Sequence, residues 1–164
     1  MIRPRSLHAG ELRVASAPGR LVIHGLGSCV AVFVYDPDAR VGGLAHILLP
    51  APPRSGPQAP PEKAGRYATT AVASMVEASI RLGARRQALL AKITGGSRMF
   101  AFDAGSPRET VGDKNVEAAL RVLQDLRVKV VGRDVGGIRG RTVVADLSDG
   151  SLVIRTARGE ERRV

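Results

Sequence analysis

Residues 25–50, GLGSCVAVFVYDPDARVGGLAHILLP, hold the feature around which the rest of the chain is organised. A short glycine-rich turn leads directly into Cys29, the only cysteine. The β-branched and aromatic run at 30–35 predicts a strand, and the Asp-Pro-Asp that follows predicts a turn. Residues 41–49 then predict a returning strand that carries His46. Two adjacent strands of this kind would bring a thiol and an imidazole together.

That pairing matters because only the thiolate form of cysteine attacks well. A free thiol has a pKa of about 8.5, and a neighbouring imidazolium or a set of N–H groups lowers it. We therefore expect Cys29 to react with electrophiles faster than free cysteine at neutral pH. The turn glycines lack Cβ atoms, so N–H groups near Gly27 and Ser28 can approach a developing oxyanion. Acyl transfer needs this arrangement.

The same two residues also admit plainer interpretations. A lone cysteine is often a small buried hydrophobe, and a histidine between apolar neighbours, such as His46, is often a core residue. One cysteine and three histidines give none of the usual ligand spacings, so no metal and no other cofactor is expected. Composition and spacing leave a cysteine hydrolase open without establishing it.

Successive blocks of the chain resemble the chemoreceptor glutamine deamidases, the CheD family of bacterial and archaeal chemotaxis. These blocks are GLGSCVAV, the YDP turn, VGGLAHILLP, PEKAGRYATTAV, AKITGGSRMF, VGDKNVEAAL and DVGGIRGRTVVADLSDGSLVIR. They follow the family's order over roughly residues 11–155. The resemblance implies an α/β/β sandwich, with Cys29 as nucleophile and His46 as its base.

One position departs from the family pattern. The family is expected to have a threonine shortly before the GLGSC box as a third catalytic member, and here Ile23 and His24 stand in that place. Ile23 cannot form a side-chain hydrogen bond, so either His24 or a backbone group must orient His46. Strand alternation puts the two side chains on opposite faces, so only one of them can face Cys29.

The remaining pattern predicts one α+β domain over residues 1–164, with mixed β-sheets and two main helices covering one face. Residues 1–10 are expected to be a loose tail. Further strands are expected at 11–15, 20–24, 89–94, 129–132, 142–147 and 151–156. The last two form a hairpin about Asp149-Gly150, a dipeptide that favours tight turns.

Apolar residues at helical spacing predict the two helices. The first covers 68–82 and has Gly83 just beyond its end. The second begins at Gly112, with Gly112 or Asp113 as its cap, and its apolar stripe reaches Arg127.

Two loops invite a functional interpretation. Residues 51–66 are expected to be a Pro-rich exposed loop, either a plain insertion or a lid or docking segment. Gly95, Gly96 and Ser97 follow a strand and suggest either a phosphate loop or a close backbone approach to the Cys29 site. No G-x-x-x-x-G-K-[ST] string is present, so we expect these three residues to line the site and contribute to substrate or oxyanion binding.

The chain carries 25 Lys and Arg against 15 Asp and Glu, a net charge of +10. This charge predicts an acidic partner. Only 3% of residues are aromatic and Trp is absent, which argues against nucleic acid because base stacking would lack platforms. Chemoreceptor helices rich in Glu and Gln are an alternative acidic partner for this positive charge. A third interpretation is that the arginines are simply solvated and bind no partner. No apolar stretch approaches the ~20 residues of a membrane span, so no membrane insertion and a cytoplasmic location are expected.

Two function classes follow from these observations. The first is an enzyme that hydrolyses the side-chain amides of chemoreceptor glutamines to glutamate through a thioester on Cys29, with His46 as the base. The second is a non-catalytic adaptation protein that binds receptors or a CheC-like phosphatase. A basic nucleic-acid-binding module is a third, weaker alternative.

Overall fold

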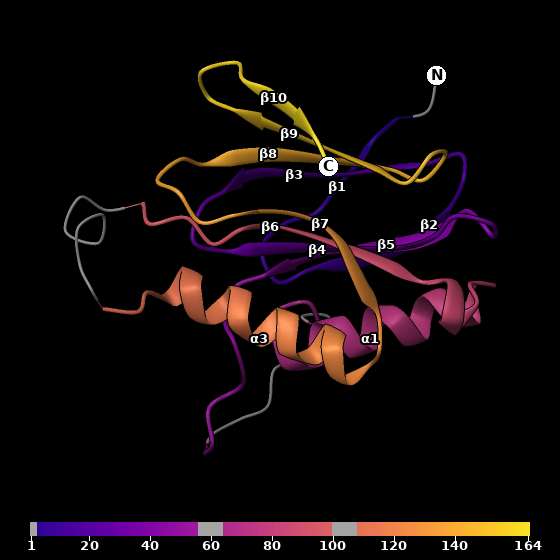
Figure 1. Ribbon diagram of the computed structural model, residues 1–164, viewed down its shortest axis with the longest axis horizontal. Coiled ribbons are helices and arrows are strands. Elements are labelled where there is room, and N and C mark those ends of the chain that lie inside the picture. The colour runs from indigo at the N-terminus through magenta and orange to yellow at the C-terminus, as the bar shows by residue number, and fades with distance from the viewer. Residues whose placement is uncertain (1–2, 56–63, 100–107) are drawn as a thin grey trace.

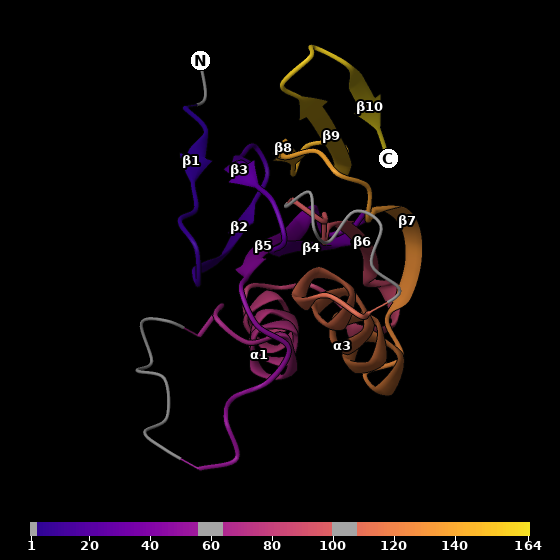
Figure 2. The same cartoon turned by 90° about the vertical axis from the view of Figure 1, so that its left-hand side faces the viewer.

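The computed structural model describes residues 3–55, 64–99 and 108–164, which form three stacked layers (Figure 1). Within these ranges, two main helices cover one face of a five-stranded sheet, and a second five-stranded sheet covers its other face. Figure 2 shows the layers end-on, with the helices on one side and β8, β9 and β10 on the other. Each sheet contains one parallel pair among antiparallel ones. The predicted α+β class and α/β/β sandwich are confirmed.

The inner sheet contains the two strands predicted from residues 25–50. Its order is β2-β5-β4-β6-β7, with bounds Leu12–Ser16, Val41–Ile47, Val30–Asp36, Leu90–Gly95 and Lys129–Val135. Every residue of β4 and β5 is buried. The reason is that helices cover one face of these strands and the outer sheet covers the other.

The outer sheet has the order β1-β3-β8-β9-β10, with bounds Arg5–Ser6, Arg20–Leu26, Arg141–Asp146, Ser151–Thr156 and Glu161–Arg163. β8 and β9 form the predicted hairpin, and Gly150 takes the positive φ of 70° that its turn requires. The sequence pattern missed β10, because three charged residues carry no strand periodicity.

The helices begin and end close to where the pattern placed them. α1 covers Ala68–Arg81, and Gly83 follows it with a φ of 114°. α3 covers Val111–Asp125, and a one-turn 3-10 helix, η2, lies at Arg86–Ala88. The cap of α3 is Thr110, whose side chain accepts the N–H of Asp113 in a capping box, so the expected cap was wrong. Arg127 lies beyond the end of the helix and is not part of its stripe.

Strand alternation divides the core into two clusters. Along β4, Val30, Val32 and Val34 pack toward the helices, whereas Ala31 and Phe33 pack toward the outer sheet. The same alternation fixes the side to which each site residue points.

The segment expected to be a loose tail forms part of the fold. β1 pairs in parallel with β3, and the N–H of Leu7 donates to the carbonyl of Val22 at 2.8 Å. Leu7 is buried between the two sheets. A two-residue strand is too short to show periodicity, so the sequence could not indicate it. Of the predicted loop 51–66, residues 51–55 carry no helix or strand, and 56–63 lie outside the described residues.

Asp36 ties the β4–β5 turn to the loop after α1. Its carboxylate is fully buried and accepts the N–H groups of Asp38 at 2.9 Å, Ala39 at 3.0 Å and Arg85 at 2.8 Å. Burial alone would raise the pKa of this carboxyl, but the three donors and the nearby Arg85 guanidinium outweigh it and lower the pKa. Its stabilising contribution is therefore complete above the ordinary pKa of about 3.9 and is lost as the pH falls through the lower folded value.

Replacing Asp36→Asn should lower the free energy of unfolding at neutral pH by about 1–3 kcal/mol, because charged acceptors of buried N–H groups are lost. The difference from wild type should shrink in acid, where the wild-type carboxyl is also protonated. Urea denaturation across the acid range measures both effects. A difference that stays constant with pH would contradict the assignment.

Candidate functional site

Cys29 lies between the end of β3 and the beginning of β4, at the predicted strand mouth. Its side chain is half-buried and packs against the cluster between the two sheets. Its carbonyl accepts the N–H of Gly96 at 2.9 Å. The nucleophile candidate is thus held by its backbone and partly open at its side chain.

His46 lies on the neighbouring strand and points to the same side. Its neighbours Ala45 and Ile47 pack toward the helices, so alternation directs His46 toward the outer sheet, as for Leu44. His46 pairs with Ala31, two residues beyond Cys29. The two candidates are therefore diagonal neighbours on adjacent strands, a relation that places Cα atoms about 7–8 Å apart. Strand alternation therefore puts the side chains of Cys29 and His46 on the same side of the inner sheet, as the predicted pair of thiol and imidazole requires.

Burial favours the neutral forms of both the Cys29 thiol and the His46 imidazole. Burial raises the pKa of the Cys29 thiol, against a smaller lowering by its own backbone N–H. Burial lowers the pKa of His46, against smaller raising effects of the Leu7 carbonyl and the Glu11 carboxylate. The unliganded site therefore holds a thiol beside a neutral imidazole. This opposes the expected fast reaction of Cys29 at neutral pH and favours proton transfer during attack.

Burial shows which of the two residues at the position that departs from the family pattern faces the site. Ile23 is fully buried between the sheets, whereas His24 is exposed and its side chain forms no hydrogen bond to any described residue. The expectation that His24 might orient His46 finds no contact to support it. The other alternative, a backbone group, has a candidate in the Leu7 carbonyl, which raises the pKa of His46 against the effect of burial. The Nδ1 atom of His46 is buried and has no partner among the described residues.

The turn before Cys29 offers N–H groups. Within the described residues, the N–H groups of Gly27, Ser28 and Cys29 donate no hydrogen bond. Such donors at the N-terminal side of a nucleophile suit an oxyanion.

The Gly95-Gly96-Ser97 segment approaches this turn closely, as predicted. A Cβ on Gly95 would lie 2.3 Å from the Cys29 carbonyl oxygen, so no side chain fits there. The N–H of Ser97 donates to the Gly27 carbonyl at 3.0 Å, and that of Gly96 is already used by Cys29. These two N–H groups support the turn and are not available to a substrate.

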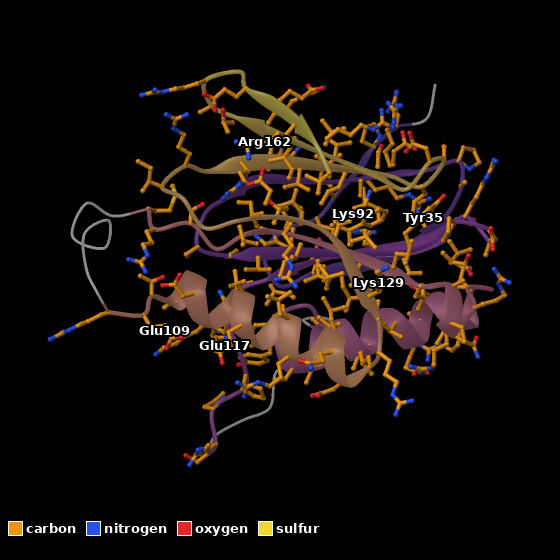
Figure 3. All side chains as sticks on the ribbon, viewed as in Figure 1. Tyr35, Lys92, Glu109, Glu117, Lys129 and Arg162 are labelled. Carbon is orange, nitrogen blue, oxygen red and sulfur yellow. The ribbon has the colours of Figure 1, made fainter. Side chains whose placement is uncertain are left out.

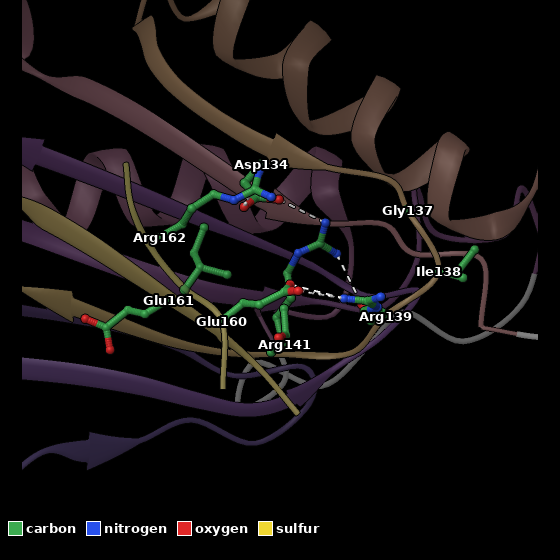
Figure 4. Close-up of a pocket in the computed structure, with 10 residues that line it drawn as sticks. Asp134, Gly137, Ile138, Arg139, Arg141, Glu160, Glu161 and Arg162 are labelled. Atoms are coloured by element: carbon green, nitrogen blue, oxygen red, sulfur yellow. Dashed lines mark hydrogen bonds and ion pairs between the residues drawn. The ribbon is translucent and has the colours of Figure 1, made fainter. Parts of the chain in front are cut away.

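The side chain of Ser97 is also committed. It is 1% exposed, accepts from the Arg141 guanidinium at 2.6 Å and donates to the Arg139 carbonyl at 2.7 Å. Arg141 in turn pairs with Asp134 at 3.0 Å. Figure 4 shows Asp134, Arg139 and Arg141 at a cavity of about 280 Å³, where Arg139 also pairs with Glu160. Ser97 therefore links the loop before β8 to the turn before Cys29.

Asn115 is a site neighbour that sequence reasoning missed. It is fully buried on α3, and its Nδ2 donates to the carbonyls of Ser28 at 3.2 Å and Leu48 at 2.8 Å. A signal was present, because the other buried residues of α3 are Gly112, Ala119 and Leu123, and only Asn115 is polar.

A cavity of about 300 Å³ opens beside Ser28 at the N-terminal end of α3. Its walls include Met99 and Val111, which are 48% and 49% exposed. Glu109 also lines it, and Figure 3 shows Glu109 at the end of the molecule opposite Tyr35. This cavity adjoins the turn before Cys29 through Ser28, and Cys29 itself is not among its lining residues.

Two further properties of the described residues bear on other functions. None of the helices there is both long and apolar enough to cross a membrane. No group of three or more His, Cys, Asp or Glu side chains there is arranged to hold a metal ion.

The chain matches the family described as CheD chemotactic sensory transduction over residues 48–156, a range that begins just after His46. Curated relatives extend the similarity across the site. The probable chemoreceptor glutamine deamidase CheD 1 of Anaeromyxobacter dehalogenans is 44% identical over 91% of this chain and 82% of its own length. The chemoreceptor glutamine deamidase CheD of Thermotoga maritima is 42% identical over 93% of this chain and 92% of its own. The probable deamidase of the same name from Methanococcus vannielii is 42% identical over 89% and 90%. The chain therefore belongs to the CheD family of chemotactic sensory transduction proteins.

Proposed function

We propose that this protein is a protein-glutamine glutaminase that hydrolyses the side-chain amides of chemoreceptor glutamines to glutamate. The observation that carries the proposal is the placement of Cys29 and His46 on one side of adjacent strands, next to a turn whose N–H groups donate to no residue that the structure describes. The names of the relatives, chemoreceptor glutamine deamidases, supply the substrate. No cofactor enters the reaction.

The reaction begins with Cys29 as a thiol and His46 as a neutral imidazole. As the Cys29 sulfur attacks the amide carbon, its proton passes to His46, and the carbonyl oxygen becomes an oxyanion held by N–H groups of the turn. The tetrahedral intermediate then breaks its C–N bond, and His46 gives the proton to the departing ammonia. The product of this half is a thioester between Cys29 and the former glutamine side chain.

The second half consumes one water molecule. His46 takes a proton from the water as its oxygen attacks the thioester carbon, and the C–S bond then breaks. The sulfur recovers a proton, and glutamate leaves. Each cycle thus converts a carboxamide and water into a carboxylate and ammonium, and it restores the thiol.

We also propose the cytoplasmic helices of chemoreceptors as partners and the cytoplasm as location. The net charge of +10 suits acidic helices, and the apolar rim of Met99 and Val111 suits the aliphatic part of a glutamine side chain. Glu109 beside the cavity adds an acceptor for an amide N–H.

A second candidate function is a non-catalytic adaptation protein that binds receptors or a CheC-like phosphatase. Two observations favour it: burial raises the pKa of the Cys29 thiol, and Ile23 places no hydrogen-bonding group in the core near the site. The two functions differ in whether the receptor gains carboxylates.

Cys29→Ala should reduce deamidation of a co-expressed receptor fragment by at least about 10³-fold, because no nucleophile remains. His46→Ala should reduce it by about 10²–10⁴-fold through loss of the base. Intact-mass analysis with peptide mapping measures the conversion of amide to acid. Undiminished conversion in Cys29→Ala would rule out the mechanism, and no conversion by wild type would favour the binding protein.

The pH dependence of thiol alkylation tests the neutral pair. Because the pKa of Cys29 is raised, the thiolate fraction at neutral pH is smaller than that of free cysteine, and the alkylation rate should keep rising above about pH 8.5. Iodoacetamide alkylation followed by mass spectrometry across the alkaline range gives the midpoint. A midpoint below that of free cysteine would show a preformed thiolate instead.

Ile23→Thr should raise the deamidation rate, because it supplies a hydroxyl at the position where the family is expected to have one. Ile23→Val is the matched control, since valine has the shape of threonine without the hydroxyl. His24→Ala should leave the rate unchanged, because the His24 side chain is exposed and contacts no group of the site among the described residues. Equal rates in the Thr and Val variants would mean that position 23 does not orient the base.

A further inference from the structure

Asn115 is a buried amide on a helix face that is otherwise apolar or glycine. It is 0% exposed, and its Oδ1 has no hydrogen-bond partner among the described residues. An unsatisfied buried acceptor is unfavourable, so a residue selected only for packing here would be apolar, as Ala119 and Leu123 are. The two bonds made by its Nδ2 therefore indicate what Asn115 does.

The first bond controls the peptide that precedes the nucleophile. Nδ2 donates to the Ser28 carbonyl, and the Ser28–Cys29 peptide is trans, so its N–H points opposite to its carbonyl. Asn115 lies on α3, so the Ser28 carbonyl that it binds faces the helix layer. The Cys29 N–H, on the other side of the same peptide, faces away from the helices. The Cys29 side chain packs on that far side, against the cluster between the sheets.

The Cys29 N–H therefore points to the side of the sheet on which its own side chain packs. The Cys29 N–H donates no hydrogen bond to another described residue, and it acts on its own thiol. A hydrogen bond to the carbonyl of a peptide also polarises that peptide and strengthens its N–H as a donor. Asn115 thus sets both the direction and the strength of this donor.

The second bond reaches the strand of the base. Nδ2 also donates to the Leu48 carbonyl, two residues after His46. The side-chain amide of Asn115 therefore connects two backbone segments, the one just before Cys29 and the one just after His46. The first turn of α3 packs directly against the Gly95-Gly96-Ser97 segment. The approach is so close that a Cβ on Gly112 would lie 2.7 Å from the Gly96 carbonyl oxygen.

We infer that Asn115 is a positioning residue that orients the Ser28–Cys29 peptide, so that the Cys29 N–H serves as an oxyanion donor and the strand ends carrying Cys29 and His46 keep their spacing. The inference rests on the proposed function for its catalytic meaning, whereas its effect on the thiol can be measured without a receptor.

The test uses Asn115→Asp and Asn115→Ser in the full chain. An aspartate carboxylate repels both carbonyls, and serine is too short to reach them together. Each variant should lower kcat for receptor deamidation by about 10- to 100-fold with little change in KM, as expected for a misdirected oxyanion donor. Each should also move the midpoint of iodoacetamide alkylation of Cys29 to higher pH, because the N–H that lowers the thiol pKa is turned away.

The matched control is Leu123→Ala, which empties a fully buried position two turns along the same helix. It should reduce thermal stability at least as much and leave kcat and the alkylation midpoint unchanged. If folded Asn115→Ser keeps both wild-type values, or if Leu123→Ala shifts them equally, Asn115 is only structural and the inference is overturned.

A measurement on the wild type covers the case in which the variants do not fold. The side-chain amide protons of Asn115 should exchange slowly with solvent, and their NMR signals should shift when Cys29 is alkylated. Fast exchange, or signals indifferent to alkylation, would overturn the inference. If wild type fails to deamidate while the midpoint still depends on Asn115, the positioning stands and the proposed function fails.

Discussion

The antiparallel pairing of β4 with β5 is the interaction on which the rest of the structure depends. Seven residue pairs, from Val30↔Ile47 to Asp36↔Val41, align two strands that are buried on both faces. A shift of one residue would reverse every side chain, moving the valines of β4 from the helix side to the other sheet. The register therefore fixes both cores at once, and it fixes the face shared by Cys29 and His46.

Backbone contacts, more than side chains, build the site around that pair. Gly96 and Ser97 use their N–H groups to hold the carbonyls of Cys29 and Gly27, and glycine at position 95 permits the approach. Within the described residues, this support leaves the N–H groups of the turn itself without acceptors. Such N–H groups suit the proposed reaction, in which charge develops on an oxygen, because backbone donors held in place need little reorganisation.

Burial sets the chemical state of the site. It raises the pKa of the thiol and lowers that of the imidazole, so charge separation before substrate binding is unfavourable. A neutral pair has a further consequence, since a thiol that is mostly protonated is less readily oxidised or alkylated. In the proposed reaction, Cys29 would therefore react mainly with a bound substrate, whose carbonyl oxygen takes up the charge as the sulfur attacks.

The sequence by itself determined two adjacent strands, predicted at 30–35 and 41–49 and found at 30–36 and 41–47, together with both main helices and the hairpin at Gly150. Local periodicity and turn chemistry express these features within short stretches. The same two strands put Cys29 and His46 on neighbouring segments of the chain. Only the tertiary structure decided the place of Leu7, the exposure of His24 and the contacts of Asn115. Leu7 lies in a strand of two residues, too short for any periodic signal, and acquires its role by lying next to β3. Asn115 lies 87 residues from Ser28 and 67 from Leu48, so only folding brings its amide to their carbonyls.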